Sequence, residues 1–116
     1  MRASDWPRFH YAADVRRVID GDTIEASVDC GMRIAQVRRI RLLGYDAPEL
    51  FSGTDRIAGA AARDALVAIL PVGSRVYVAT QLDRTSFDRL LADVFVAGGD
   101  GELVNVADLM VDHRAI

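Results

Sequence analysis

Apolar and polar residues alternate along five short stretches of this chain, at residues 11–19, 23–28, 32–43, 75–82 and 89–97. A period of two is typical of strands that bury one face. The third stretch separates two sets of residues: Ile34, Ile40 and Leu42 on one face, and Val37, Arg39, Arg41 and Leu43 on the other. The alternation therefore predicts five strands.

Two further stretches have a helical period. Residues 56–70 are rich in alanine, follow a possible Thr54-Asp55 cap and stop at Pro71. Their expected apolar stripe is Ile57, Ala61, Ala65 and Ile69. Residues 103–114 place Val106, Leu109 and Met110 on one stripe, with Val104 at its margin, and Met110 is interpreted as core filling rather than as a ligand.

The expected order is three strands, a helix, two strands and a helix. Because helices do not alternate with strands, a parallel α/β sheet is excluded, and the order favours a mainly β (α+β) fold. We expect a five-stranded Greek-key barrel of the OB type, with one inserted helix and a C-terminal helix. Residues 1–10 would be an N-terminal extension, and residues 11–116 a single domain.

The composition is that of an ordinary globular domain, with 51% hydrophobic and 27% charged residues among 116. The lone Cys30 excludes an internal disulfide and a cysteine-based zinc site, and it fits a small strand residue. Residues 1–10 lack an apolar run, so we expect neither a signal peptide nor a membrane anchor, and a cytoplasmic location by default. A monomer is the default expectation.

Charge is distributed unevenly along the chain. The net charge of −3 argues mildly against non-specific binding to nucleic acid. The sequence contains no lysine, however, and its arginines crowd one stretch at Arg33, Arg38, Arg39 and Arg41. Guanidinium groups suit bidentate binding of phosphate. The distribution of the charges therefore matters more than their sum.

Two acidic clusters flank this arginine-rich stretch. Asp20 and Asp22 lie in a turn between the first two expected strands, and Asp46 and Glu49 lie in a proline-containing loop after the third. Either cluster alone is typical of an ordinary turn. Together they would bring carboxylate oxygens close to Arg41. Such oxygens suit Ca²⁺ or Mg²⁺, whereas zinc prefers histidine or cysteine.

Three blocks, at residues 18–24, 41–49 and 83–92, resemble the motifs of the staphylococcal nuclease (thermonuclease) family in order and spacing. The resemblance covers nearly the whole chain from Val15 onward. It implies an OB-fold domain that hydrolyses DNA or RNA with Ca²⁺, prefers single strands, cleaves the P–O5′ bond and leaves 3′-phosphates.

The resemblance also implies a role for each matched residue. Asp22 and Asp46 would bind Ca²⁺ through their carboxylates, and Ala47 would bind it through its backbone carbonyl. Glu49 would orient or deprotonate the attacking water. Arg41 and Arg89 would grip the scissile phosphate and stabilise its developing charge. Phe87 would contact the substrate.

Some positions depart from the family pattern. The family usually has an aromatic residue followed by glycine where this sequence has Phe87-Asp88. The tyrosine hydroxyl and the turn glycine are therefore both missing, which predicts altered geometry near Arg89. The family's final helix and its tyrosines have no counterpart, and the loop at residues 51–55 is short and has no lysine, so we expect weaker nucleotide binding. His10 and His113 match no motif, and no role is assigned to them.

Three alternatives remain open on sequence grounds. The chain can be a catalytically weak or inactive OB module of the same type that binds nucleic acid or protein. It can be a generic single-strand binder, although aromatic residues do not cluster in the sequence. Arg41 and Arg89 can also be ordinary surface salt-bridge partners, and Asp20 a turn residue that bonds its own backbone.

Overall fold

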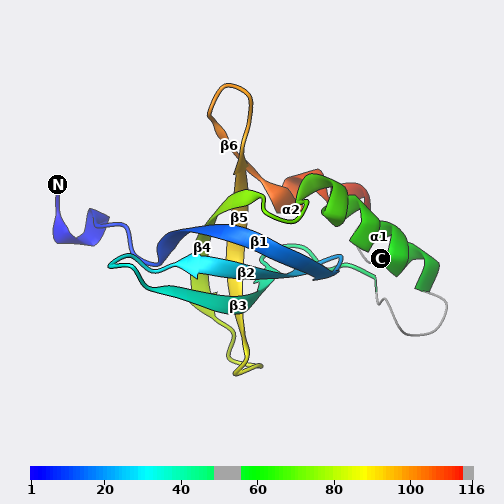
Figure 1. Cartoon of the computed structure of the whole chain (residues 1–116), viewed down its shortest axis with the longest axis horizontal. Helices are drawn as coiled ribbons and strands as arrows, with labels where there is room; N and C mark the ends of the chain where they lie inside the picture. The colour runs from blue at the N-terminus through cyan, green and yellow to red at the C-terminus, as the bar shows by residue number, and fades with distance from the viewer. Residues whose placement is uncertain (49–55, 114–116) are drawn as a thin grey trace.

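The computed structural model of the chain describes residues 1–48 and 56–113. Five strands form a closed barrel, as expected (Figure 1). The strands are β1 (His10–Asp20), β2 (Thr23–Asp29), β3 (Ala35–Leu42), β4 (Arg75–Leu82) and β5 (Arg89–Ala97). The chain is thus mainly β with an OB-like barrel, and the predicted limits of the last two strands match the observed ones.

The barrel closes through one parallel pairing. Strand β1 pairs antiparallel with both β2 and β4, β2 with β3, and β4 with β5. Residues 39–42 of β3 then pair in parallel with residues 89–92 of β5. Alternate residues of every strand fill the interior, among them Ile24, Ile40, Val76 and Val94. The closure places residues that are about 50 positions apart in sequence side by side.

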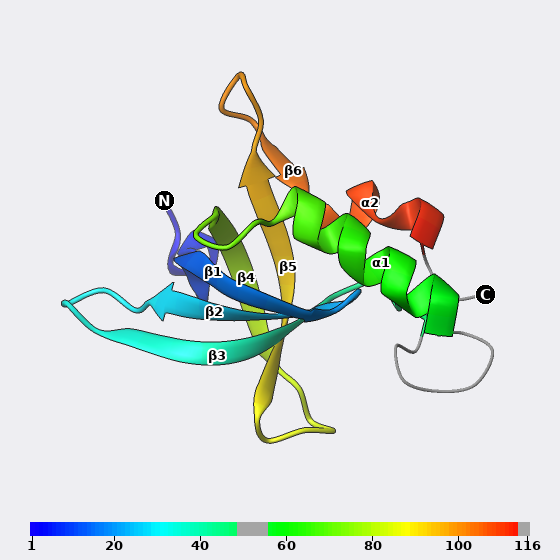
Figure 2. The same ribbon diagram turned by 45° about the vertical axis from the view of Figure 1, so that its right-hand side comes forward.

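Helix α1 (Arg56–Ile69) lies between β3 and β4 in sequence and packs beside the end of β1 (Figure 2). Its buried residues are Gly59, Ala62 and Leu66. The predicted stripe is therefore only partly correct: Ala65 and Ile69 pack against the core, whereas Ile57 is 86% exposed and Ala61 is exposed. The helix turns Ala62 inward because that small side chain meets Gly21. A β-carbon at Gly21 would lie 2.7 Å from that of Ala62.

The C-terminal segment also differs from its prediction. Residues Leu103–Asn105 form a short strand, β6, that pairs antiparallel with β5, and only Val106–Leu109 form helix α2. The Asn105 side chain accepts the Ala107 N–H at 2.9 Å and so begins the helix later than expected. Met110 is fully buried and fills the core as predicted, whereas Leu109 is 49% exposed.

The third strand begins at Ala35 rather than at the predicted Met32. Gly31, Met32 and Arg33 all have positive φ, which makes this segment a turn between β2 and β3. Cys30 lies just after β2 rather than within a strand, as a partly buried free thiol. A short 3₁₀ helix, Ala3–Asp5, precedes β1. Within the described residues, no helix is long and apolar enough to span a membrane.

Candidate active site

The turn between β1 and β2 is held against the rest of the fold by a close contact. Gly21 is buried, and a β-carbon there would lie 2.7 Å from the β-carbons of both Ala47 and Ala62. Any larger residue at Gly21 would push these neighbours apart. The contact therefore fixes Asp20 and Asp22, on either side of Gly21, next to the loop that carries Asp46.

Arg41 contacts both predicted carboxylate ligands, Asp22 and Asp46. The same terminal nitrogen of Arg41 contacts Asp22 Oδ2 at 3.7 Å and Asp46 Oδ1. The Arg41 side chain is 30% exposed, Asp22 14% and Asp46 74%. Residues predicted from two separate motifs thus lie together, and a single positive group reaches both carboxylates.

Asp22 is the buried member of this group. Its pKa is raised from 3.8, first because burial penalises the carboxylate and then because Asp20 lies beside it. Hydrogen bonds from the Ala47 N–H, at 3.1 Å, and the Thr23 hydroxyl, at 3.0 Å, offset part of this rise. Partial burial therefore disfavours the charged form of Asp22, although Arg41 lies 3.7 Å away.

Two predicted roles in this region stay predictions. The Ala47 N–H donates a hydrogen bond to Asp22, which fixes the loop. The predicted role of the Ala47 carbonyl as a metal ligand stays a prediction. Glu49 lies outside the described residues. Asp20 accepts the Asp22 N–H at 3.1 Å, as expected of a turn residue that bonds its own backbone.

Arg89 projects from the same face of the barrel wall as Arg41. In the parallel β3–β5 pairing, Arg89 lies beside Arg39, and Leu91 lies beside Arg41. Since Ile40 and Ala92 point into the core, these four residues point outward. Arg41 and Arg89 are therefore diagonal neighbours on adjacent strands.

Asp83 orients Arg89, a feature that the sequence analysis missed. The Asp83 Oδ2 atom accepts a hydrogen bond from Arg89 Nε at 2.7 Å. The Asp83 Oδ1 atom accepts two more, from the Thr85 N–H at 2.9 Å and from the Thr85 hydroxyl at 2.6 Å. The hydroxyl of Thr85 and the guanidinium of Arg89 lower the pKa of Asp83 to about 2. Asp83 contacts Nε, and within residues 1–48 and 56–113 the two terminal nitrogens of Arg89 make no hydrogen bond or ion pair.

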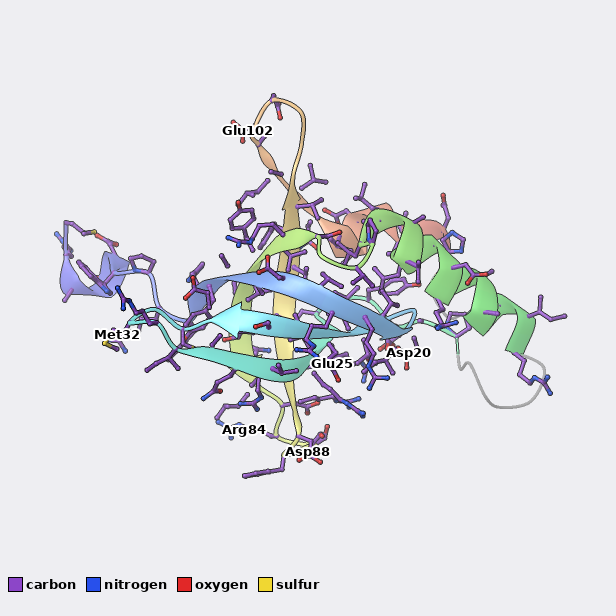
Figure 3. The ribbon with its side chains drawn as sticks, viewed as in Figure 1. Asp20, Glu25, Met32, Arg84, Asp88 and Glu102 are labelled. Carbon is purple, nitrogen blue, oxygen red and sulfur yellow. The ribbon has the colours of Figure 1, made fainter. Side chains whose placement is uncertain are left out.

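Phe87 and Asp88 belong to the hairpin loop that joins β4 to β5. Figure 3 shows Asp88 at the tip of this hairpin and Asp20 at the distant β1–β2 turn. The Phe87 side chain is 98% exposed. An exposed aromatic side chain two residues before Arg89 can stack on a base, so its predicted contact with substrate stays a prediction.

Three cavities adjoin these groups. A polar one of about 390 Å³ is lined by Arg41, Asp46 and Leu91, among others. One of about 700 Å³ is lined by Asp83 and Arg89, among others. A mainly apolar one of about 740 Å³ lies under the β4–β5 hairpin and is lined by residues such as Leu90. The two arginines that share the outer face thus line different cavities, and Arg41 shares its cavity with a carboxylate, Asp46.

Comparison with protein-family models finds no match to this chain, and comparison with curated proteins finds none either. The link to the nuclease family therefore rests on the three sequence blocks and is tested below as a proposal. The OB-like barrel is shared by proteins with many functions, so the fold alone assigns none.

The residues present fit a hard divalent cation. Asp22 and Asp46 both contact one terminal nitrogen of Arg41, so their carboxylate oxygens lie close enough together to offer two oxygen ligands of the kind that hard cations prefer. In residues 1–48 and 56–113, no three histidine, cysteine or acidic side chains form a metal-binding group. A cation here would need backbone oxygens, water or a substrate phosphate to complete its shell, which Ca²⁺ accepts.

Proposed function

We propose that the protein is a calcium-dependent nuclease that hydrolyses phosphodiesters of single-stranded DNA or RNA. One observation carries the proposal: Arg41 reaches both Asp22 and Asp46, on the outer face that Arg89 shares. Two carboxylates for a hard cation and two guanidinium groups for a phosphate are the minimum set for metal-assisted phosphodiester hydrolysis. The three family-like blocks supply the same residues independently.

Arg41 and Arg89 would bind the two non-bridging oxygens of the scissile phosphate. Negative charge grows on these oxygens as water attacks phosphorus, so contacts with guanidinium groups strengthen in the transition state. Asp83 would hold Arg89 ready for this contact, because it fixes Nε and leaves the terminal nitrogens pointing outward. Little reorganisation of Arg89 would then be needed when substrate binds.

Asp22, Asp46 and the Ala47 carbonyl would hold the cation, which when bound would supply further positive charge at the phosphate. Arg41 would then exchange its contact with Asp46 for the phosphate. Glu49 comes three positions after Asp46 in the sequence, and by the family resemblance it would take the proton of the attacking water. The products would be a 3′-phosphate and a free 5′-hydroxyl.

A cleavage assay with matched variants tests this function. Denatured DNA and RNA are incubated in Ca²⁺ with the wild type, Arg41→Gln and Arg33→Gln, and the product ends are identified. Arg33 is a suitable control because it lies in the exposed turn between β2 and β3 and loses the same charge.

The wild type and Arg33→Gln should release 3′-phosphates at equal rates, and Arg41→Gln should be about 10²- to 10³-fold slower. Binding of the strands without any cleavage by the wild type would instead favour the alternative of an inactive OB module. Equal activity of Arg41→Gln and the wild type would overturn the assignment of the site.

A further inference from the structure

We propose that Arg39 binds the backbone phosphate next to the scissile one, so that the substrate strand is held at two consecutive phosphates. This inference rests on the proposed function and extends it from the scissile phosphate to the neighbouring part of the chain. Arg39 belongs to none of the three family-like blocks, and its position in the sheet is what distinguishes it.

Arg39 lies directly beside another positive charge. The parallel β3–β5 pairing sets Arg39 next to Arg89, and strands in a sheet lie only about 4.8 Å apart. Arg41, two residues further along β3, projects from the same face. Like charges that face each other across strands destabilise a sheet. Three arginines in this arrangement therefore indicate a surface built for an anion.

The acidic residue nearest in register does not neutralise Arg39. Glu25 on β2 pairs with Arg39 across the sheet, and Figure 3 shows it over strands β2 and β3. Its carboxylate contacts Arg16 at 3.7 Å and Arg17 at 3.3 Å instead. Within the described part of the chain, Arg39 is exposed and makes no hydrogen bond or ion pair.

Arg39 differs in this respect from the other two arginines of the face. Arg41 contacts Asp22 and Asp46, and Arg89 contacts Asp83. Those two are positioned by carboxylates, whereas Arg39 keeps its whole guanidinium free for a ligand. Its α-carbon lies about 7 Å from that of Arg41 along β3, so one extended strand can contact both side chains at successive phosphates.

Substrate length separates this role from that of the scissile-phosphate arginines. On a dinucleotide with one phosphodiester, Arg39→Gln should match the wild type in kcat/KM. On a trinucleotide and on longer single strands it should be about five- to tenfold weaker, mainly through KM. Arg33→Gln should match the wild type on all of them. An equal loss on the dinucleotide and on longer strands would contradict the second-phosphate role.

Equilibrium binding tests Arg39 even if no cleavage occurs. Fluorescence anisotropy with a labelled oligothymidylate in chelator should show weaker binding by Arg39→Gln, with a log Kd against log salt slope smaller by about 0.7. Arg33→Gln should keep the wild-type slope. An unchanged slope for Arg39→Gln would overturn the inference while leaving the proposed function to its own assay.

Thermal unfolding excludes a merely structural role. Because Arg39 faces Arg89 without a neutralising partner, Arg39→Gln should keep or raise the melting temperature. A lowered melting temperature together with unchanged binding would show that Arg39 serves the fold and would overturn the inference.

Discussion

Arg41 and Arg89 each contact a carboxylate, but those carboxylates differ in their electrostatic surroundings. Asp83 receives three hydrogen bonds from Thr85 and Arg89, and its pKa falls to about 2. Asp22 is buried beside Asp20, and its pKa is raised. Hydrogen bonds stabilise the Asp83 carboxylate, whereas burial disfavours the charged form of Asp22 even with Arg41 3.7 Å away. The first suits the orientation of an arginine, and the second suits the capture of a cation.

The largest effect on activity should come from removing the proposed general base, Glu49. Glu49→Gln keeps the size of the side chain but removes the proposed base, so kcat should fall about 10²- to 10⁴-fold with little change in substrate affinity. Single-turnover cleavage of labelled single-stranded DNA measures kcat, and circular dichroism checks that folding is unchanged. A fully active Glu49→Gln would mean that another group acts on the water.

A smaller loss of activity should follow when the contact between Asp83 and Arg89 is broken. Asp83→Ala leaves Arg89 in place but frees its Nε, so kcat/KM should fall about tenfold through lost orientation. Thr85→Val keeps the Arg89 contact and removes only the hydroxyl bond, so it should cost less than Asp83→Ala. If both variants keep wild-type kcat/KM, Arg89 does not need Asp83 for its function.

The two carboxylates should affect stability with opposite signs. Asp83 has a lowered pKa, so its ionised form stabilises the fold above pH 3.8, and this contribution is lost as pH falls toward 2. Asp22 has a raised pKa, so its ionisation costs stability as pH rises through that pKa. At pH 7 Asp83→Asn should lower the melting temperature and Asp22→Asn should raise it.

Melting curves from pH 2 to 8 test this contrast, and both differences from wild type should shrink toward pH 2. Asp22→Asn should gain stability while losing Ca²⁺ binding, a trade of function against stability. If both substitutions change the melting temperature at pH 7 in the same direction, the proposed difference between the two regions is wrong.

The smallest effect should come from Asp88, at the tip of the β4–β5 hairpin. Asp88→Gly and Asp88→Asn both remove a negative charge beside Arg89, so at low salt each should raise kcat/KM about two- to threefold. At high salt the charge effect is screened, and both variants should converge on the wild type. A gain by Asp88→Gly alone, at both salt concentrations, would instead indicate that backbone freedom of glycine matters.

Local sequence patterns predicted most of the barrel. Alternation located Arg75–Leu82 and Arg89–Ala97 correctly, because a strand with one buried face carries its period in consecutive residues. The helical period located the buried face of α1 only in part, because its centre depends on the contact of Ala62 with Gly21. It also missed β6, because Leu103–Asn105 become a strand only by pairing with β5.

The residues of the candidate site were predicted less completely, because some of their contacts also depend on the pairing of distant segments. The motifs named Asp22, Arg41, Asp46 and Arg89, and the first three do meet. Asp83 and Arg39 were missed because their significance depends on pairing: Asp83 folds back on Arg89, and Arg39 faces Arg89 through the β3–β5 closure. The acidic residue at the end of β4, six positions before Arg89, was the available signal for Asp83.

The most direct test of the central claim is the metal dependence of cleavage. Purified protein is incubated with denatured DNA in Ca²⁺, in Zn²⁺ and in excess EGTA, and the rate of release of 3′-phosphate ends is measured. The account predicts cleavage in Ca²⁺, none in EGTA, and little or none in Zn²⁺, since two carboxylates and a carbonyl suit calcium. Undiminished cleavage in excess EGTA would contradict it.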